Sequence, residues 1–246
     1  MENNKDIQKR IDSFLSEHKI KVEGGQVSTE KDMAILLNRI AKSEIDKANY
    51  EKGLYFALHA YEFDKTNIYS VFLQGMGFRF TGQYDKALNA FKYYNNNKHD
   101  LPSLVNIGFC LVELQNNEEA LEVFSNIVKN ISENEERENS SLMALVYECM
   151  GNIYLSREDV LEFDPTDKLK INYKLAVKYY KHSLKLNRSN HILLNRLAAC
   201  YYHFDDERKV LYCYEEAAKV APEEKNYSDA VKELKNAGIV SEIIEF

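Results

Sequence analysis

The sequence has little of the two residues that interrupt helices. Its 246 residues include only three prolines and nine glycines, whereas apolar residues make up 45% of the chain. Proline and glycine are the least favourable residues inside helices, so their scarcity favours helices over sheets. The length suits one or two ordinary domains or one elongated array, with enough apolar residues for a sizeable core.

The sequence also lacks an excess of basic residues and any long apolar run. Its formal net charge is −7 and its isoelectric point is about 5.5. Binding to nucleic acid or to anionic membrane depends on basic patches, so we expect neither as a partner. The first ten residues hold no apolar core of the signal-peptide type, and no run is long enough to cross a bilayer. We therefore expect a cytoplasmic protein without membrane insertion.

Sequence signatures of catalysis and metal binding are missing. The four cysteines, Cys110, Cys149, Cys200 and Cys213, contain no C-x-x-C pair, and each lies in an apolar helical pattern. This predicts reduced, buried thiols. The six histidines form no H-E-x-x-H pair, and no P-loop, G-x-S-x-G or dinucleotide fingerprint occurs. We expect no enzymatic activity, no metal and no cofactor.

What the sequence does contain is a repeat. Gly75 is followed twelve positions later by Ala87, and the same pair returns 33 residues on as Gly108 and Ala120. The other copies pair Ala41 with Gly53, Gly151 with Ala176, and Ala198 with Val210. Five copies in register indicate a repeat architecture, in which one unit cannot bury its apolar faces alone and must stack on its neighbours.

The period and residue types resemble the tetratricopeptide repeat, whose 34-residue pattern is W-x2-L-G-x2-Y…A-x3-F…P. The second copy shows Gly75, Phe78, Ala87 and Phe91, and the fifth closes with Pro222. The tryptophan of that pattern is replaced by Val71, Leu104, Tyr147 and Leu194. The resemblance implies an all-α, right-handed α-α superhelical solenoid of about five repeats, with N- and C-terminal capping helices.

The repeats and their flanks divide the chain into three parts. Residues 1–30 are an N-terminal helix and linker, residues 34–222 are the five repeats, and residues 223–246 are a C-terminal capping helix and an apolar tail. The individual repeats cover about 34–67, 68–100, 101–134, 144–190 and 191–222. The acidic segment 132–139 is predicted to be a solvated linker between the third and fourth repeats.

The spacing of small residues predicts how each helix pair packs. We expect the small residue of the first helix, such as Gly75, to meet the small residue of the second, such as Ala87. We expect Phe78 and Phe91 to fill the space between neighbouring repeats. Gly82 stands at the turn, where a left-handed backbone conformation is often needed.

The fourth repeat carries about thirteen extra residues between its two helices, within 158–172. An insertion there projects as a loop and leaves the stack intact. One interpretation is a tolerated surface loop, since long surface loops cost little. The other is a partner contact, since long loops in compact proteins are often functional.

Both ends of the array need a cap. Apolar residues at helical spacing predict an N-terminal helix over 5–19, and Thr29 with Asp32 resembles a capping box that opens the first repeat helix. Ser228 is predicted to cap a last helix that stops near Gly238. The apolar tail 239–246 either lies over the last repeat or docks into a partner or a second copy.

The resemblance also implies which residues face a ligand, because the first helices of tetratricopeptide repeats line the concave surface. The partner-binding residues expected there are Asn38, Arg39, Lys42, Phe72, Met76, Arg79, Phe80, Asn106, Phe109, Asn152, Asn195, Arg196 and Tyr202. The centre of this surface is apolar, which predicts an exposed apolar strip that binds a peptide. The alternative is that these aromatic residues pack within the array or under the N-terminal helix.

The resemblance implies a non-enzymatic scaffold or adaptor that binds a peptide segment of another protein. Two alternatives stay open: a dedicated chaperone that shields an apolar segment of a client, as in type III secretion, and a peptide-sensing regulatory module. A carboxylate clamp of the heat-shock-chaperone type is a poor match, because Leu73, Val105 and Phe109 stand at its expected positions. A homodimer through the terminal segments is a further possibility.

Overall fold

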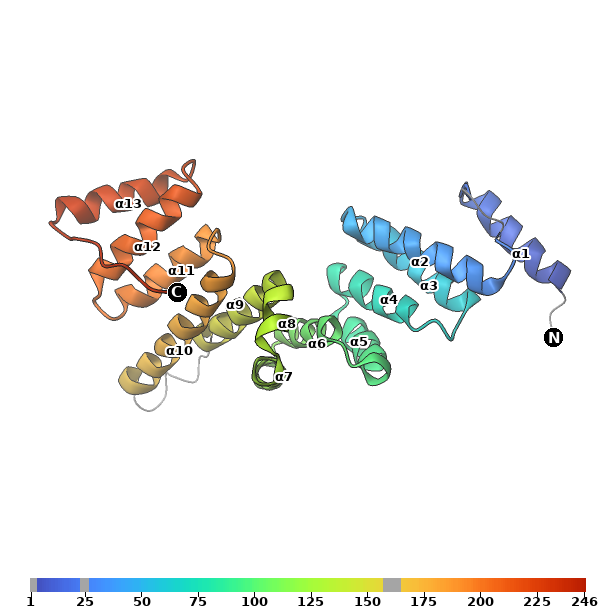
Figure 1. Ribbon diagram of the computed structural model, residues 1–246, viewed down its shortest axis with the longest axis horizontal. Helices are drawn as coiled ribbons and strands as arrows, with labels where there is room; N and C mark the ends of the chain where they lie inside the picture. Colours follow the sequence, from blue (N-terminus) through green and yellow to red (C-terminus); the bar gives the residue numbers. More distant parts are fainter. Residues whose placement is uncertain (1–3, 23–26, 157–164) are drawn as a thin grey trace. The chain divides into compact units, whose positions relative to one another are not determined.

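The computed structural model describes residues 4–22, 27–156 and 165–246, and within these ranges the chain is built of helices without strands. The chain divides into two compact units, Met1–Val123 and Phe124–Phe246, and each is described by itself. The helices (Figure 1) are α1 (Asn4–Glu17), α2 (Glu30–Asp46), α3 (Tyr50–Phe63), α4 (Tyr69–Phe80), α5 (Tyr84–Lys98), α6 (Leu101–Glu113), α7 (Asn117–Asn130), α8 (Glu133–Glu138), α9 (Ser140–Ser156), α10 (Pro165–Leu186), α11 (His191–Tyr202), α12 (Glu207–Val220) and α13 (Lys225–Asn236).

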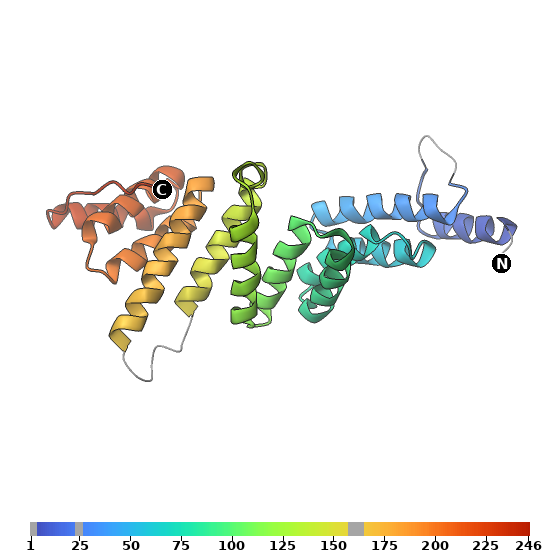
Figure 2. The ribbon, with the colours of Figure 1, turned by 60° about the horizontal axis from the view of Figure 1, so that its bottom comes forward.

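The first unit is built from stacked helix pairs. Helix α3 packs against both α2 and α4, and α5 packs against both α4 and α6 (Figure 2). The predicted capping box starts α2 as expected: Thr29 accepts a hydrogen bond from the amide of Asp32, whose carboxylate accepts from the Thr29 amide. Met33 and Leu37 then place their side chains in a core that Phe56 completes.

The second unit repeats this construction. Helix α10 packs against α9 and α11, and α12 packs against α11 and α13. The core between these helices is formed by Ala176, Tyr180, Leu194, Leu197 and Val210, all at most 4% exposed. Helix α7 spans the boundary between the two units, because Val123 ends the first and Phe124 begins the second.

The predicted contact between small residues occurs in the first repeat, where a Cβ atom on Gly53 would lie 3.1 Å from the carbonyl oxygen of Ala41. In the second repeat the nearest neighbour of the small residue is an aromatic ring. A Cβ atom on Gly75 would lie 2.8 Å from Cε1 of Phe91, so the glycine makes room for a ring. Phe91 therefore packs against the first helix of its own repeat. Gly82 has the expected left-handed conformation, with φ of 76°.

Two segments differ from their predicted conformation. Residues 165–172 of the expected inserted loop are helical, because α10 begins at Pro165; the rest of that loop lies outside the described residues or at their edge. Segment 132–139, expected as a linker, forms the short helix α8. The side chain of Ser132 accepts from the amide of Glu135, and this capping box makes the short helix possible.

The C-terminal segment packs against the last repeat. Helix α13 begins at Lys225, three residues before the predicted cap Ser228, whose hydroxyl donates to the Lys225 carbonyl inside the helix. The tail returns across α12 (Figure 1) with Ile244 only 4% exposed in the core of the second unit. The tail thus lies over the last repeat, which is the first of the two expectations for this segment. None of the helices in the described ranges is long and apolar enough to cross a membrane.

Candidate partner-binding surfaces

The expected ligand-facing residues of α2 divide into exposed and buried ones. Arg39 and Lys42 are exposed, and the Lys42 ammonium pairs with Asp46 at 2.6 Å. Asn38 is only 4% exposed, and neither polar atom of its amide has a hydrogen-bond partner in the part of the chain that the structure describes. Asn38 therefore lies within the packed layer beneath the surface that Arg39 presents.

The aromatic residues of the first unit do not form the expected continuous exposed strip. Phe109 is 8% exposed, and Phe72 and Met76 are half-buried against the core beneath the N-terminal helix. Phe80 alone among the aromatic residues predicted there is well exposed, at 41%. Phe72, Met76 and Phe109 therefore follow the alternative expectation, which was packing within the array or under the N-terminal helix.

Arg79 and Asn106 form a polar connection between α4 and α6. The guanidinium of Arg79 donates to Oδ1 of Asn106 at 2.7 Å, and the Asn106 amide donates to the carbonyl of Pro102. The same guanidinium lies over the rings of Phe80 and Phe109, with 4.9 and 4.8 Å to their centroids. These contacts fix the orientation of Arg79 and explain why Phe109 is covered.

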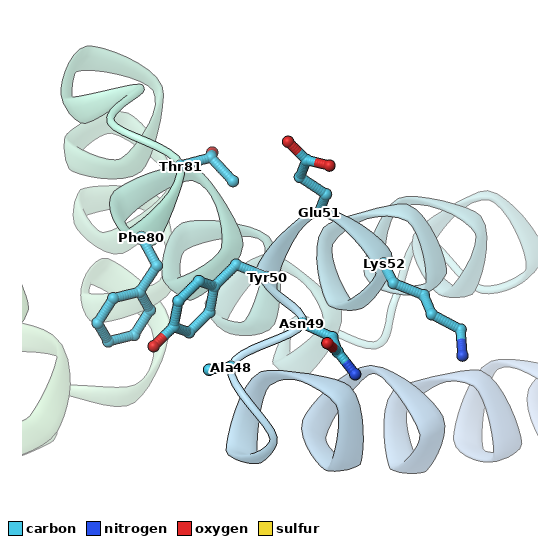
Figure 3. Close-up of a pocket in the computed structure, with 7 residues that line it drawn as sticks. All are labelled: Ala48, Asn49, Tyr50, Glu51, Lys52, Phe80 and Thr81. Atoms are coloured by element: carbon cyan, nitrogen blue, oxygen red, sulfur yellow. The ribbon is translucent and has the colours of Figure 1, made fainter.

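A shallow pocket of about 590 Å³ opens beside the exposed Phe80. Figure 3 shows the rings of Tyr50 and Phe80 face to face, at a centroid distance of 4.4 Å and an interplanar angle of 16°. The other side chains come from the turn after α2, the start of α3 and the end of α4, with Glu51 and Lys52 directed away from the ring pair. The stacked rings thus form part of the wall of this pocket, between the two repeats.

The second unit carries a polar network on its first helices. Arg196 of α11 donates to Glu148 at 2.8 Å and to Oδ1 of Asn152 at 3.0 Å, and both acceptors belong to α9. The hydroxyl of Tyr180 also donates to Asn152, and the amide of Asn190 donates to Glu148. Two of the predicted binding residues, Asn152 and Arg196, therefore lie together and hold neighbouring repeats in register.

The other two predicted residues of this unit, Asn195 and Tyr202, are exposed on α11. Tyr202 is 68% exposed, which is the largest value among the predicted aromatic residues. His203 follows it and shares a hydrogen bond of 2.7 Å with the hydroxyl of Tyr173. The end of α11 thus presents the exposed ring of Tyr202, and the neighbouring His203 is already hydrogen-bonded to Tyr173.

An apolar groove of about 580 Å³ lies next to Tyr202 and was not expected from the sequence. Its lining residues are Ala199, Tyr202, His203, Glu207, Val210, Tyr214, Ala230, Glu233, Leu234 and Ala237. They come from α11, α12 and α13 and from the residues that cap α11 and α13 at their C-termini. The contribution of α13 escaped prediction because this helix lies outside the five repeats, although its strong amphipathic pattern indicates an apolar face that needs a partner.

The cysteines fit a structural role. Burial raises the pKa of the Cys110 thiol to about 11 and that of Cys200 to about 12, and it raises the pKa of Cys213 further. Cys149 differs from the expectation of buried thiols because it is only half-buried. Among the described residues, no three histidine, cysteine or acidic side chains are grouped so that they could hold a metal ion.

The stacked, antiparallel helix pairs define the class: an all-α helical-repeat protein. No protein-family profile and no curated protein sequence matches the chain significantly. Solved structures do resemble it. PilF of Pseudomonas aeruginosa is 15% identical with a TM-score of 0.61, covering 85% of this chain and 91% of that one. MamA (residue 41 to the end) of Desulfovibrio magneticus RS-1 is 14% identical with a TM-score of 0.59, covering 78% and 97%.

A third structure names the repeat. YrrB, described as a tetratricopeptide-repeat protein with an unusual peptide-binding site, is 14% identical with a TM-score of 0.55, covering 90% of this chain and 97% of that one. At such identities the likeness establishes the fold, which is the tetratricopeptide-repeat fold. The resemblance inferred from the repeat spacing is thereby confirmed.

Proposed function

We propose that the chain is a non-enzymatic scaffold that binds a peptide segment of another protein along its first helices. The fold supports this, because helical-repeat proteins use extended surfaces to bind partners. The peptide-binding site named for YrrB gives a precedent within the same fold. The observation that carries the proposal is Tyr202, which is 68% exposed beside an apolar groove.

An exposed tyrosine at such a place suits a binding surface better than a folding role. Tyrosine is enriched at the centres of protein interfaces, because it buries a large apolar ring and keeps a hydroxyl for hydrogen bonding. Asn195 is exposed on the same helix, and its amide can bond the backbone of an extended segment. Arg196 is held by Glu148 and Asn152, so it stiffens the surface and is less available to a ligand.

The chaperone alternative loses its main support. It relied on an exposed apolar strip in the first unit, and Phe109 is buried there while Phe72 and Met76 are half-buried. A cytoplasmic location and self-association through the terminal segments stay predictions.

The test is affinity purification from the native source with three versions of the full chain: wild type, Tyr202→Ser and the control Tyr93→Ser. Tyr93 is a matched control because it is 48% exposed on α5, a second helix in the other unit. We expect a stoichiometric partner that is retained by wild type and Tyr93→Ser and lost by Tyr202→Ser. A partner retained by all three, or no partner at all, would contradict the proposal.

A further inference from the structure

The groove between α11, α12 and α13 has an apolar floor and an acidic rim. Val210 and Leu234 lie in its lining together with the small residues Ala199 and Ala237. Its volume of about 580 Å³ falls within the range of pockets that bind small ligands or single large side chains. Small residues on facing helices leave this space open, since a larger side chain at either position would occupy it.

The first unit has a pocket at the corresponding place, and aromatic side chains line it. There, Tyr50 precedes Gly53 by three residues, as Glu207 precedes Val210 in the fifth repeat. Tyr50 stacks on Phe80 of the next first helix at a centroid distance of 4.4 Å, so a pair of rings forms part of the wall of that pocket. Glu207 provides no ring in the second unit, so the groove there lacks this aromatic pair.

The rim of the groove carries two carboxylates, Glu207 and Glu233, and within the described residues neither takes part in an ion pair. Glu207 stands in the first turn of α12, where the helix dipole stabilises a negative charge. Glu233 stands in the last turn of α13, where the dipole disfavours it. The helix dipole therefore does not stabilise the carboxylate of Glu233, whereas a cation bound at the rim would stabilise it.

Two other acidic residues of this region have partners within the chain. Glu215 pairs with Lys235 at 2.7 Å, and Glu242 pairs with Arg208 at 3.5 Å. The two rim carboxylates combine the lack of an ion pair with a place beside the apolar floor of the groove. A basic side chain that approached both would gain Coulomb energy from each, and this gain is larger beside an apolar floor than in bulk water.

We propose that this groove receives an aromatic or large aliphatic side chain from a partner segment that carries lysine or arginine beside it. The partner's ring would take the place that Phe80 takes in the first unit, and Tyr202 would cover it from the exposed side. The basic residues would pair with Glu207 and Glu233. This inference rests on the proposed function and specifies the chemistry of the segment that the scaffold binds.

The test uses a synthetic, fluorescein-labelled peptide with one phenylalanine flanked by two lysines on each side. Its binding to the full chain is followed by fluorescence anisotropy. A matched peptide with alanine in place of phenylalanine has the same charge, so it measures the general attraction of a basic peptide to a chain of net charge −7. A third peptide carries glutamate in place of lysine.

We expect saturable binding of the phenylalanine peptide, at least tenfold weaker binding of the alanine peptide and none of the glutamate peptide. Added salt should weaken the binding, because the rim carboxylates are exposed to solvent. Equal affinity for the phenylalanine and alanine peptides would overturn the proposal, since the apolar floor would then contribute nothing.

Variants of the chain locate the binding. Ala237→Phe fills the groove from an exposed position, and Glu207→Gln with Glu233→Gln removes both rim charges. The control is Glu138→Gln with Glu223→Gln, which removes two exposed carboxylates outside the groove. We expect binding to fall at least tenfold in the first two variants and to stay within twofold in the control. Circular dichroism verifies that each variant is folded.

The outcome separates this inference from the proposed function. If the Ala237→Phe chain loses the peptide and the native partner together, both proposals hold. If the peptide binds equally to wild type and Ala237→Phe while Tyr202→Ser still loses its native partner, the scaffold function stands and the chemistry assigned to this groove is wrong.

Discussion

The ring of Phe91 occupies the space that a side chain at Gly75 would need. The nearest ring atom, Cε1, lies 2.8 Å from the position of a Cβ on Gly75, and Phe91 is fully buried. The same relationship recurs in the second unit, where Tyr180 lies against Gly151. Glycine in these first helices is thus required by a ring from the second helix of the same repeat.

We expect Gly75→Ala to lower the free energy of unfolding by roughly 1–2 kcal/mol, because overpacking outweighs the gain in helix propensity. The measurement is the urea midpoint of the full chain by circular dichroism. Asn89→Ala, at an exposed site of α5, is the control and should leave the midpoint unchanged or slightly raised. The loss should shrink in a Phe91→Leu background, since the ring is gone. Strictly additive effects would contradict this explanation.

Local features of the fold were predictable from the sequence, and contacts across helices were not. The capping box at Thr29 and the left-handed turn at Gly82 depend on a few adjacent residues, so spacing alone indicates them. The contact between Gly75 and Phe91 depends on how two helices cross, which residue spacing does not specify. Repeat spacing therefore predicted the helix pairs but did not indicate the ring that packs against Gly75.

The candidate site was less predictable than the fold. Projection onto the first helices treated Phe109 as exposed, yet α6 is apolar on nearly all sides and buried from Val105 to Leu111. An all-round apolar helix is a sign of burial, and this signal was present in the sequence. The groove beside Tyr202 depends on α13, whose position against α12 follows from tertiary packing outside the repeat pattern.

The tail offers a test with a matched control. Ile244 is 4% exposed in the core of the second unit, whereas its neighbour Ile243 is 76% exposed. We expect Ile244→Ala to cost about 2–4 kcal/mol of stability, from lost burial and the cavity left behind. Ile243→Ala should change stability by less than about 0.5 kcal/mol, as exposed substitutions do. Equal urea midpoints for the two variants would show that the tail is not part of the core.

The capping box predicts a dependence on pH. The hydrogen bond from the Thr29 side chain lowers the pKa of Asp32 below its ordinary value of 3.8. The folded state thus favours the carboxylate, so its stabilisation is present above about pH 4 and is lost as the pH falls through the lowered pKa. We expect Asp32→Asn to lower the urea midpoint at pH 6 and to have no effect at the acidic end of the range.

Asp85→Asn is the control for this measurement. Asp85 also stands in the first turn of its helix, α5, where no side-chain cap forms. Its substitution should have a smaller effect at pH 6 than that of Asp32. A pH-independent effect of Asp32→Asn would mean that the carboxylate charge is not what stabilises the start of α2.

The ion pair between Glu148 and Arg196 joins two repeats and should be measurable by a double-mutant cycle. The two atoms lie 2.8 Å apart, and the Glu148 side chain is 17% exposed. We expect a coupling energy of about 0.5–1 kcal/mol for Glu148→Gln and Arg196→Gln, reduced by added salt. The exposed pair Asp229 and Lys232, at 3.3 Å on α13, is the control and should show coupling near zero.

The cysteines should react with a thiol reagent in two groups, because thiolate formation and access both govern reactivity. Burial raises the pKa of Cys110 to about 11 and that of Cys200 to about 12, so neither forms appreciable thiolate at pH 8. Cys213 is fully buried, whereas Cys149 is half-buried. In the native chain at pH 8 we expect one fast-reacting thiol, which Cys149→Ser removes, while all four react in denaturant. A fast phase that survives Cys149→Ser would place a mobile opening at one of the other three cysteines.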